Sequence, residues 1–260
     1  MKTAVLTGAS SGLGYQIALE VAKRYDNVIL ISRNSDKLRN IGQKCLALSA
    51  KKVICLSCDL SKTSQIITTT NWIKSHFENI DLLINNAGMA FFKSFKEQNI
   101  AEINQCLSLN LQGLITFTRL LLPLMINNQS NTDIINIGSM AGKVSTAKTT
   151  IYAASKAGVI AFSNALRLEL KADNIKVHTV NLGPMDTNFF ATADPKGKYA
   201  KSVKNIMLNP KTVAQKTILL VGSTKRELNL PRLMDFGGKV YNCFPTIGDL
   251  ILNNPMVNRK

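Results

Sequence analysis

The sequence predicts an α/β fold, a single doubly wound domain of the Rossmann type with a central parallel sheet of about seven strands. Three observations predict it. Short, continuous apolar runs alternate with longer segments of helical periodicity, and a glycine-rich loop follows the first apolar run. The chain of 260 residues, 45% of them hydrophobic, is long and apolar enough for one large domain with both sheet faces covered. A helical lid and a C-terminal helical tail are expected in addition.

Seven short runs are predicted as strands. They are Thr3–Thr7, Val28–Ile31, Val53–Leu56, Leu82–Asn85, Ile134–Ile137, Val177–Asn181 and Glu227–Pro231. Between them, apolar residues recur with a period of about 3.6, which predicts amphipathic helices, most clearly over Leu13–Arg24 and Ala153–Leu170. Strands that are apolar throughout and separated by helices indicate a parallel sheet, and such sheets bind ligands at the carboxyl ends of their strands.

Residues 1–230 are predicted to form the main domain. Within it, the periodicity becomes irregular over about 187–212, and we interpret this segment as a lid over the site. Residues 231–260 are predicted to form a tail of one or two amphipathic helices. A tail of this kind packs over the pocket, pairs with a second subunit or lies on a membrane surface, and the sequence leaves these alternatives open.

The formal net charge is +16, from 32 basic and 16 acidic residues. This charge attracts anionic partners in general, and a Lys-rich solvated surface produces the same balance. Nucleic acid is not an expected partner, because no reading motif is present and aromatic residues make up only 6% of the chain. No apolar run approaches the ~20 residues that cross a bilayer, and no signal peptide is evident. The protein is expected in the cytoplasm, with peripheral contact to a membrane as an alternative for the tail.

The five cysteines predict neither a disulfide framework nor a metal site. Cys55 and Cys58 lie in one apolar run, VICLSC, which is typical of a strand, where an offset of three residues points the thiols to opposite faces. No second pair and no nearby histidine completes a zinc site. The two histidines, His76 and His178, lie outside the motifs described below and are predicted to be surface or strand residues.

A glycine-rich loop joins the first predicted strand to the first predicted helix. Its candidate binding residues are Gly8, Ser10, Ser11, Gly12, Leu13 and Gly14. The glycines allow a tight turn and a close approach of the backbone to a pyrophosphate, and the following helix offers unpaired N–H groups. The loop in this strand–turn–helix context predicts a dinucleotide-binding site.

The end of the second strand indicates which dinucleotide binds. Sites that prefer NAD place an acidic residue there, where it binds the ribose hydroxyls. This chain has Ser32 and Arg33 instead, and a guanidinium can pair with a 2′-phosphate. The predicted cofactor is therefore NADP(H).

A serine, a tyrosine and a lysine predict the chemistry. Tyr152 and Lys156 are four residues apart on a predicted helix, so they share one face. A nearby ammonium is expected to lower the pKa of a tyrosine from its usual value near ~10 toward the working pH. Tyr152 then exchanges a proton with a carbonyl or alcohol oxygen as hydride is transferred, and Ser139 hydrogen-bonds the same oxygen.

With these motifs in this order, the sequence resembles classical members of the short-chain dehydrogenase/reductase family, from Lys2 to Asn229. The resemblance implies a catalytic tetrad of Asn110, Ser139, Tyr152 and Lys156, in which Asn110 holds a water of a proton relay. It also implies cofactor contacts beyond the glycine loop and Arg33. These are Asp59, Leu60, Asn86, Ala87, Gly88, Tyr152, Lys156, Gly183 and Thr187. A homo-oligomer, either a dimer or a tetramer, is a further implication.

One residue departs from the family pattern. Leu182 stands where the family usually has proline, so the turn that binds the nicotinamide side of the cofactor is expected to be less rigid. Gly183 and Thr187 match, and cofactor binding is expected to be retained.

Substrate specificity is predicted to reside in the lid and in the segment after Gly88. The candidate lining residues are Met89, Phe91, Phe92, Phe189, Phe190, Tyr199, Ile206, Met207 and Leu208. Five lid lysines accompany them, at positions 196, 198, 201, 204 and 211. A basic, apolar lid favours a lipid-like or acyl carbonyl compound with an anionic head. The alternatives are a 3-oxoacyl group on an acidic carrier protein and, in another class, a non-catalytic NADP-sensing or interaction protein.

Overall fold

The computed structural model describes residues 1–128, 131–195 and 197–253. In this part of the chain, seven strands form one parallel sheet in the order β3-β2-β1-β4-β5-β6-β7. The strands are β1 (Thr3–Thr7), β2 (Asn27–Ser32), β3 (Lys52–Ser57), β4 (Leu82–Asn85), β5 (Thr132–Ile137), β6 (Ile175–Leu182) and β7 (Glu227–Leu230). The predicted doubly wound sheet is confirmed, and all seven predicted runs are strands.

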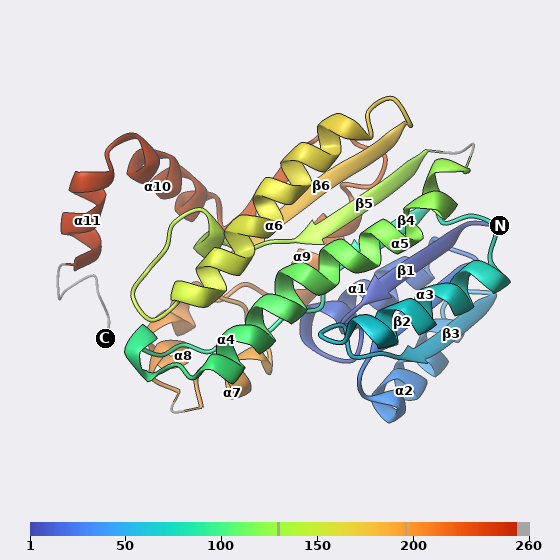
Figure 1. Cartoon of the computed structure of the whole chain (residues 1–260), viewed down its shortest axis with the longest axis horizontal. Coiled ribbons are helices and arrows are strands. Elements are labelled where there is room, and N and C mark those ends of the chain that lie inside the picture. Colours follow the sequence, from blue (N-terminus) through green and yellow to red (C-terminus); the bar gives the residue numbers. More distant parts are fainter. Residues whose placement is uncertain (129–130, 196, 254–260) are drawn as a thin grey trace.

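Helices cover both faces of the sheet (Figure 1). On one face lie α1 (Gly12–Ala22), α2 (Ser35–Leu46) and α9 (Pro210–Ile218). On the other lie α3 (Thr63–His76), α5 (Leu114–Ile126) and α6 (Thr150–Glu169). The strand order reverses between β1 and β4, so the loops after these two strands diverge and open a crevice at their carboxyl ends.

A long helical run precedes β5. It begins with α4 (Ile100–Leu107), continues through a π-helical segment (Ser108–Gly113) and ends with α5. By length and composition alone, this run, Ile100–Ile126, is the one helix among the described residues that is long and apolar enough to cross a membrane. Its inner side chains, including Phe117, Leu121 and Met125, are buried in the core beneath the sheet, as in a core helix of a folded domain.

The predicted lid contains two short helices, α7 (Phe189–Ala193) and α8 (Lys198–Val203), followed by a 3₁₀ turn (Lys204–Ile206). Its two ends meet where the Leu208 backbone N–H donates to the Pro184 carbonyl at 2.9 Å. Lys196, one of the predicted lid lysines, lies outside the described residues.

The predicted tail forms two helices, α10 (Arg232–Cys243) and α11 (Pro245–Asn253), and its last residues, 254–260, lie outside the described part. Figure 1 shows the two helices as an angled pair that projects beyond the sheet, next to the N-terminal end of α6. The boundary predicted at residue 230 coincides with the end of β7.

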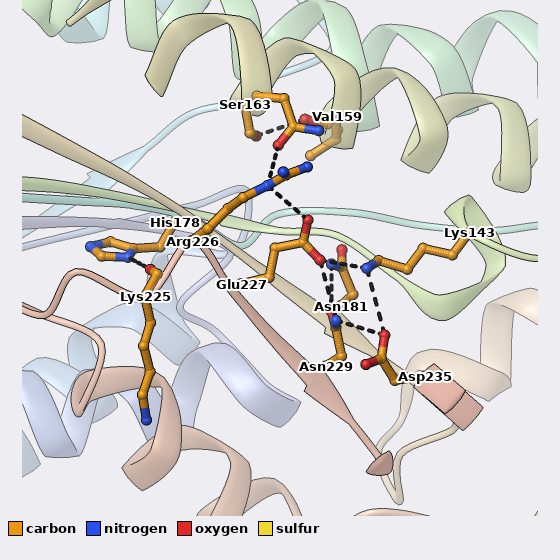
Figure 2. A network of polar contacts seen from close by, with 11 residues as sticks. Lys143, Val159, Ser163, His178, Asn181, Lys225, Arg226, Glu227, Asn229 and Asp235 are labelled. Atoms are coloured by element: carbon orange, nitrogen blue, oxygen red, sulfur yellow. Dashed lines mark hydrogen bonds and ion pairs between the residues drawn. The ribbon is translucent and has the colours of Figure 1, made fainter. Parts of the chain in front are cut away.

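The two histidines occupy the predicted kinds of position. His76 is exposed at the end of α3, where it stacks on Trp72. His178 is buried in β6, where Nε2 lies 2.8 Å from Asp133 Oδ1. Its Nδ1 lies 2.6 Å from the Lys225 carbonyl (Figure 2). Both ring nitrogens of His178 therefore have structural partners that tie β5, β6 and the segment before β7 together.

Candidate functional site

A cavity of about 1130 Å³ opens at the carboxyl ends of the strands. All but two of the predicted site residues line it, and the exceptions are Asp59 and Asn110. Residues from both ends of the chain meet here, from the glycine loop after β1 to the tail helices. The fold therefore brings together the motifs that are dispersed along the sequence.

The glycine loop has a shape that side chains would prevent. Gly8 and Gly12 have φ angles of +66° and +54°, in the left-handed region that favours glycine. A Cβ atom on Gly14 would lie 2.0 Å from the Gly8 carbonyl oxygen, so only glycine lets the loop fold back over the start of α1. This leaves the N-terminus of an 11-residue helix open to the cavity, where a phosphate group fits.

Asn86, at the end of β4, holds the same loop in place. Its side-chain amide donates to the carbonyl oxygens of Thr7 and Gly8, at 3.1 and 3.0 Å. In return, the Thr7 hydroxyl accepts hydrogen bonds from the backbone N–H groups of Asn86 and Ala87. Asn86 was predicted as a cofactor contact, and the structure shows in addition that it links β1 to β4 at the crevice.

The far end of the cavity is basic. Arg33 is exposed after β2 and lines the cavity together with Lys37, from the first turn of α2. Sequence analysis missed Lys37, although a second cation one turn after Arg33 was a readable signal. The glycine loop and these two cations fit a dinucleotide that carries an additional phosphate near the second strand.

Asp59 is not brought into the cavity. Its carboxylate accepts hydrogen bonds from the backbone N–H and the hydroxyl of Ser61, at 3.0 and 2.7 Å. Burial raises the pKa of this carboxyl, but the Ser61 hydrogen bonds and the positive charge of Arg33 outweigh it and lower the pKa. Its neighbours Cys58 and Leu60 line the cavity instead, so the predicted contact of Asp59 with the adenine stays a prediction.

Three of the four predicted catalytic residues meet at the centre of the cavity. Tyr152 and Lys156 lie one turn apart on α6, and the Tyr152 hydroxyl is hydrogen-bonded to that of Ser139, which follows β5. Ser139 Oγ is fixed from two further sides, because it accepts from the Ala141 N–H at 3.1 Å and donates to the Leu182 carbonyl at 3.3 Å. Leu182 thus ends β6 and orients the serine through its carbonyl oxygen.

The pKa of Tyr152 differs from the expectation drawn from the sequence. Burial raises it to about 12, and the hydrogen bond with Ser139 only partly opposes this. Burial also lowers the pKa of Lys156 to about 8. The Lys156 ammonium donates to the Ile137 carbonyl at 2.7 Å. Burial of the phenol outweighs any stabilisation of the phenolate by this charge, so the pKa of Tyr152 is raised and not lowered as expected. Tyr152 is a neutral phenol near pH 7 and holds the proton that a general acid needs.

Asn110, the fourth predicted catalytic residue, lies behind the cavity wall in the π-helical segment. Its side chain is fully buried, and its amide nitrogen donates to the Met89 carbonyl at 2.8 Å and to the Ser155 hydroxyl at 3.0 Å. A Cβ built on Gly88 would lie 3.3 Å from Asn110 Oδ1 and 3.5 Å from Lys156 Nζ. Asn110 therefore lies close to Lys156 without facing the cavity.

Aromatic rings form the wall next to Tyr152. Phe92 packs against Tyr152 and Tyr199, with ring centroids 5.8 and 4.9 Å apart, and Phe189 lies 6.0 Å from Tyr152. The Phe92 N–H donates to the Ala193 carbonyl at 2.7 Å, which joins the lid to the segment after β4.

Not every predicted lining residue is found in this wall. Met89, Phe92, Phe189, Phe190 and Tyr199 line the cavity, as predicted. Phe91, Ile206, Met207 and Leu208 do not. Phe91 and Leu208 pack against the two cores, and Ile206 is exposed on the 3₁₀ turn. The prediction used only the apolar character of these residues, which does not distinguish side chains that face the cavity from those that face the core or solvent.

Comparisons with known proteins show which family the chain resembles. Residues 2–197 match the family model for short chain dehydrogenases. A ketoacyl reductase, HetN, of Nostoc sp. is 39% identical over 181 residues, which is 69% of this chain and 62% of that protein. The chain thus spans less than two thirds of the length of this relative.

Solved structures show the same fold. A short chain dehydrogenase/reductase from Burkholderia phymatum, in complex with NAD, superposes with a TM-score of 0.85 at 20% identity, over 95% of this chain and 94% of that one. A short-chain dehydrogenase from Sphingobium yanoikuyae, in complex with NADPH, gives 0.80 at 25% identity, over 94% and 96%. The family model and the solved structures are consistent with the glycine loop and with the Ser139–Tyr152–Lys156 group. The chain belongs to the short-chain dehydrogenase/reductase family.

Proposed function

We propose that this oxidoreductase is an NADP(H)-dependent carbonyl reductase or alcohol dehydrogenase in which Tyr152 is the acid-base catalyst. One observation supports this above all. The Tyr152 hydroxyl is hydrogen-bonded to Ser139 and lies one turn from Lys156, in the same cavity as the glycine loop and Arg33. The family acts on CH–OH and C=O groups with a nicotinamide cofactor; the choice of NADP(H) and the residue roles are our proposal.

In this mechanism, the bound cofactor supplies hydride to the carbonyl carbon. Ser139 hydrogen-bonds the carbonyl oxygen and positions it beside the phenol. Tyr152 donates its proton to this oxygen as negative charge develops there, which completes the alcohol. The Lys156 ammonium stabilises the phenolate that remains, and Asn110 supports the backbone beside Lys156. Alcohol oxidation uses the same groups in reverse.

The preference for NADP(H) follows from charge at the end of β2. Arg33 and Lys37 both line the cavity there, and the residues from Ser32 to Ser35 include no acidic side chain that would repel a 2′-phosphate. Solved relatives bind either NAD or NADPH, so the family alone does not determine the choice.

Two alternatives remain to be tested against this proposal. The first is a 3-oxoacyl group on a carrier protein as the substrate, which the likeness to a ketoacyl reductase and the net charge of +16 favour. The second is a non-catalytic NADP-sensing or interaction protein. The retained, mutually positioned Ser139, Tyr152 and Lys156 favour an enzyme over the second alternative.

The decisive experiment is NADPH oxidation across a panel of aldehydes, ketones and 3-oxoacyl thioesters, with Tyr152→Phe as the test variant. The variant should bind NADPH in a fluorescence titration but turn over at least about 100-fold more slowly. Tyr15→Phe is the matched control and should match the wild type, because Tyr15 is a partly buried residue of α1 that does not line the cavity. Equal turnover by Tyr152→Phe and the wild type would overturn the assignment of Tyr152.

The cytoplasmic location and the homo-oligomeric state stay predictions. Light scattering of the purified protein would test for the expected dimer or tetramer.

A further inference from the structure

We propose that the tail helices α10 and α11 bind the long aliphatic chain of the substrate, so that the enzyme acts on lipid-like carbonyls or alcohols. The proposal rests on the proposed function and adds a substrate class to it. The apolar residues of the tail that line the cavity are called the tail wall below. They are Met234, Phe236, Val240, Tyr241, Phe244 and Ile247.

The tail wall belongs to the same cavity as the candidate catalytic residues. The cavity lining that includes Ser139 and Tyr152 continues through Met140 and Val144 to the tail. Phe236 and Val240 are four residues apart on α10 and share one side of it, and Phe244, at the C-cap of this helix, lines the same cavity. A chain bound against this side is therefore continuous with a carbonyl group placed at Tyr152.

The tail wall leaves apolar surface uncovered. Phe236 is 67% exposed, Phe244 59% and Ile247 57%, although all three line the cavity. The aromatic side chains of Phe92, Phe189 and Tyr199 provide apolar surface at the catalytic end of the cavity. An aliphatic chain between these surfaces removes apolar area from water on both sides, at a gain of about fourfold in binding for each methylene group buried.

In the part of the tail that the structure describes, residues 231–253, the charged side chains do not enter the cavity. Arg232, Asp235, Lys239 and Asp249 are all absent from its lining. Asp235 and Lys239 pair with each other at 3.0 Å, and Asp249 accepts a hydrogen bond from the Tyr241 hydroxyl at 2.8 Å. An uncharged wall suits a hydrocarbon chain and offers no partner for the charges of a peptide or a carrier protein.

A polar network fixes the first tail helix beside the catalytic residues. Lys143, four residues after Ser139, forms an ion pair with Glu227 of β7 and lies 3.7 Å from Asp235 of α10. Asn229 donates to both carboxylates, at 3.2 and 2.7 Å (Figure 2). The side chains of Lys143, Glu227 and Asp235 are only 16–19% exposed. The tail wall is therefore a positioned part of the site.

Close packing adds to this network. A Cβ on Gly238 would lie 3.2 Å from the Val144 side chain, so α10 sits directly against the loop after Ser139. Gly248 packs in the same way on the Tyr241 ring, which holds α11 against α10.

The same helices offer matched controls. Leu233 and Leu250 are 81% and 71% exposed and do not line the cavity. A membrane surface or a second copy of the chain would cover these outward side chains, whereas an aliphatic substrate contacts the tail wall. Substitutions on the two sides of the tail therefore distinguish the occupants.

The test uses the full chain, NADPH and three straight-chain aldehydes: butanal, octanal and dodecanal. In the wild type, kcat/KM should rise by more than tenfold from butanal to dodecanal. Phe244→Ser and Ile247→Ser should each lower the ratio of kcat/KM for dodecanal to that for butanal by about tenfold or more. Leu233→Ser and Leu250→Ser should match the wild type with every aldehyde.

A binding measurement separates this proposal from the proposed function. The fluorescent fatty acid cis-parinaric acid should bind the wild type and Leu250→Ser, and bind Phe244→Ser at least about tenfold more weakly. If no aldehyde is reduced but this binding pattern holds, the proposed function fails and the tail site stands. If aldehydes are reduced without dependence on chain length, or if Leu233→Ser and Leu250→Ser have the larger effect, the tail site is wrong. Vesicle flotation or a change of oligomer size in those two variants would then identify a membrane or a second copy as the occupant.

Discussion

The side-chain amide of Asn110 forms two hydrogen bonds with the backbone of a single residue, Met89. Its Oδ1 accepts from the Met89 N–H at 2.8 Å, and its Nδ2 donates to the Met89 carbonyl at 2.8 Å. The pair fixes the segment after β4 against the π-helical turn, next to Lys156. Asn110 thus acts here as a positioning residue for the cavity wall, in addition to any part in a proton relay.

Replacing Asn110 with alanine should destabilise the protein. The substitution leaves the Met89 N–H buried without a partner and the Met89 carbonyl with only the weak hydrogen bond from Cys106 Sγ, at a cost of about 1–3 kcal/mol for each lost bond. Chemical denaturation should show a lower free energy of unfolding, and Asn40→Ala, on the exposed side of α2, should show little change. An Asn110→Ala protein as stable as Asn40→Ala would mean that the two bonds contribute nothing.

The two shifted pKa values predict opposite pH profiles for the two directions of the reaction. The pKa of Lys156 is lowered to about 8, so the ammonium is present below this pH and is lost as the pH rises through it. Because the pKa of Tyr152 is raised to about 12, the proton donor itself stays protonated over the whole assay range. Carbonyl reduction should therefore be level below pH 8 and decline above it. Alcohol oxidation, which needs the phenolate, should instead increase with pH.

Lys156→Arg provides the control for this assignment, because a guanidinium stays charged at alkaline pH. If the variant retains activity, its reduction rate should no longer decline above pH 8. A decline that persists in Lys156→Arg would assign it to another group.

Removing the charge of Arg33 should reduce the preference for NADPH. Arg33→Ala loses a charge-assisted hydrogen bond to a 2′-phosphate, and because Arg33 is exposed to solvent we expect a loss of only about tenfold in kcat/KM for NADPH. The value for NADH should change little. Arg39→Ala is the control, since Arg39 pairs with Asp36 on α2 and does not line the cavity. An equal loss with both cofactors would show that Arg33 does not discriminate between them.

Breaking the ion pair of Lys143 should release the tail. Lys143→Met leaves two poorly exposed carboxylates, Glu227 and Asp235, without their shared cation, at a cost of about 1–3 kcal/mol. We expect faster cleavage in the tail under limited proteolysis. Lys239→Met removes a lysine that pairs with the same Asp235 but is 71% exposed, and it should behave like the wild type. Equal cleavage of the two variants would mean that the network does not hold α10.

The Lys143 network also predicts acid sensitivity. Burial raises the pKa of Glu227, but hydrogen bonds from Lys143 and Asn229 and the nearby cations outweigh burial and lower it. This contribution to stability is therefore complete above the ordinary carboxyl pKa and is lost as the pH falls through the lowered value. Proteolysis of the wild-type tail should accelerate under acidic conditions, and Lys143→Met should lose this dependence.

The sequence by itself determined the doubly wound parallel sheet, its seven strands and the candidate catalytic residues. These depend on local patterns: continuous apolar strands, a glycine loop at a strand end, and a tyrosine and a lysine one helical turn apart. Asp59 and Tyr152 show the limit of such patterns. Hydrogen bonds turn the Asp59 carboxylate toward Ser61, and burial moves the pKa of Tyr152 in the direction opposite to the expected one. Only the tertiary structure decided these points, because desolvation and side-chain partners depend on residues distant in sequence. It also decided that the tail wall faces the cavity. The amphipathic pattern of a helix indicates which side is apolar, but not which part of the molecule that side contacts.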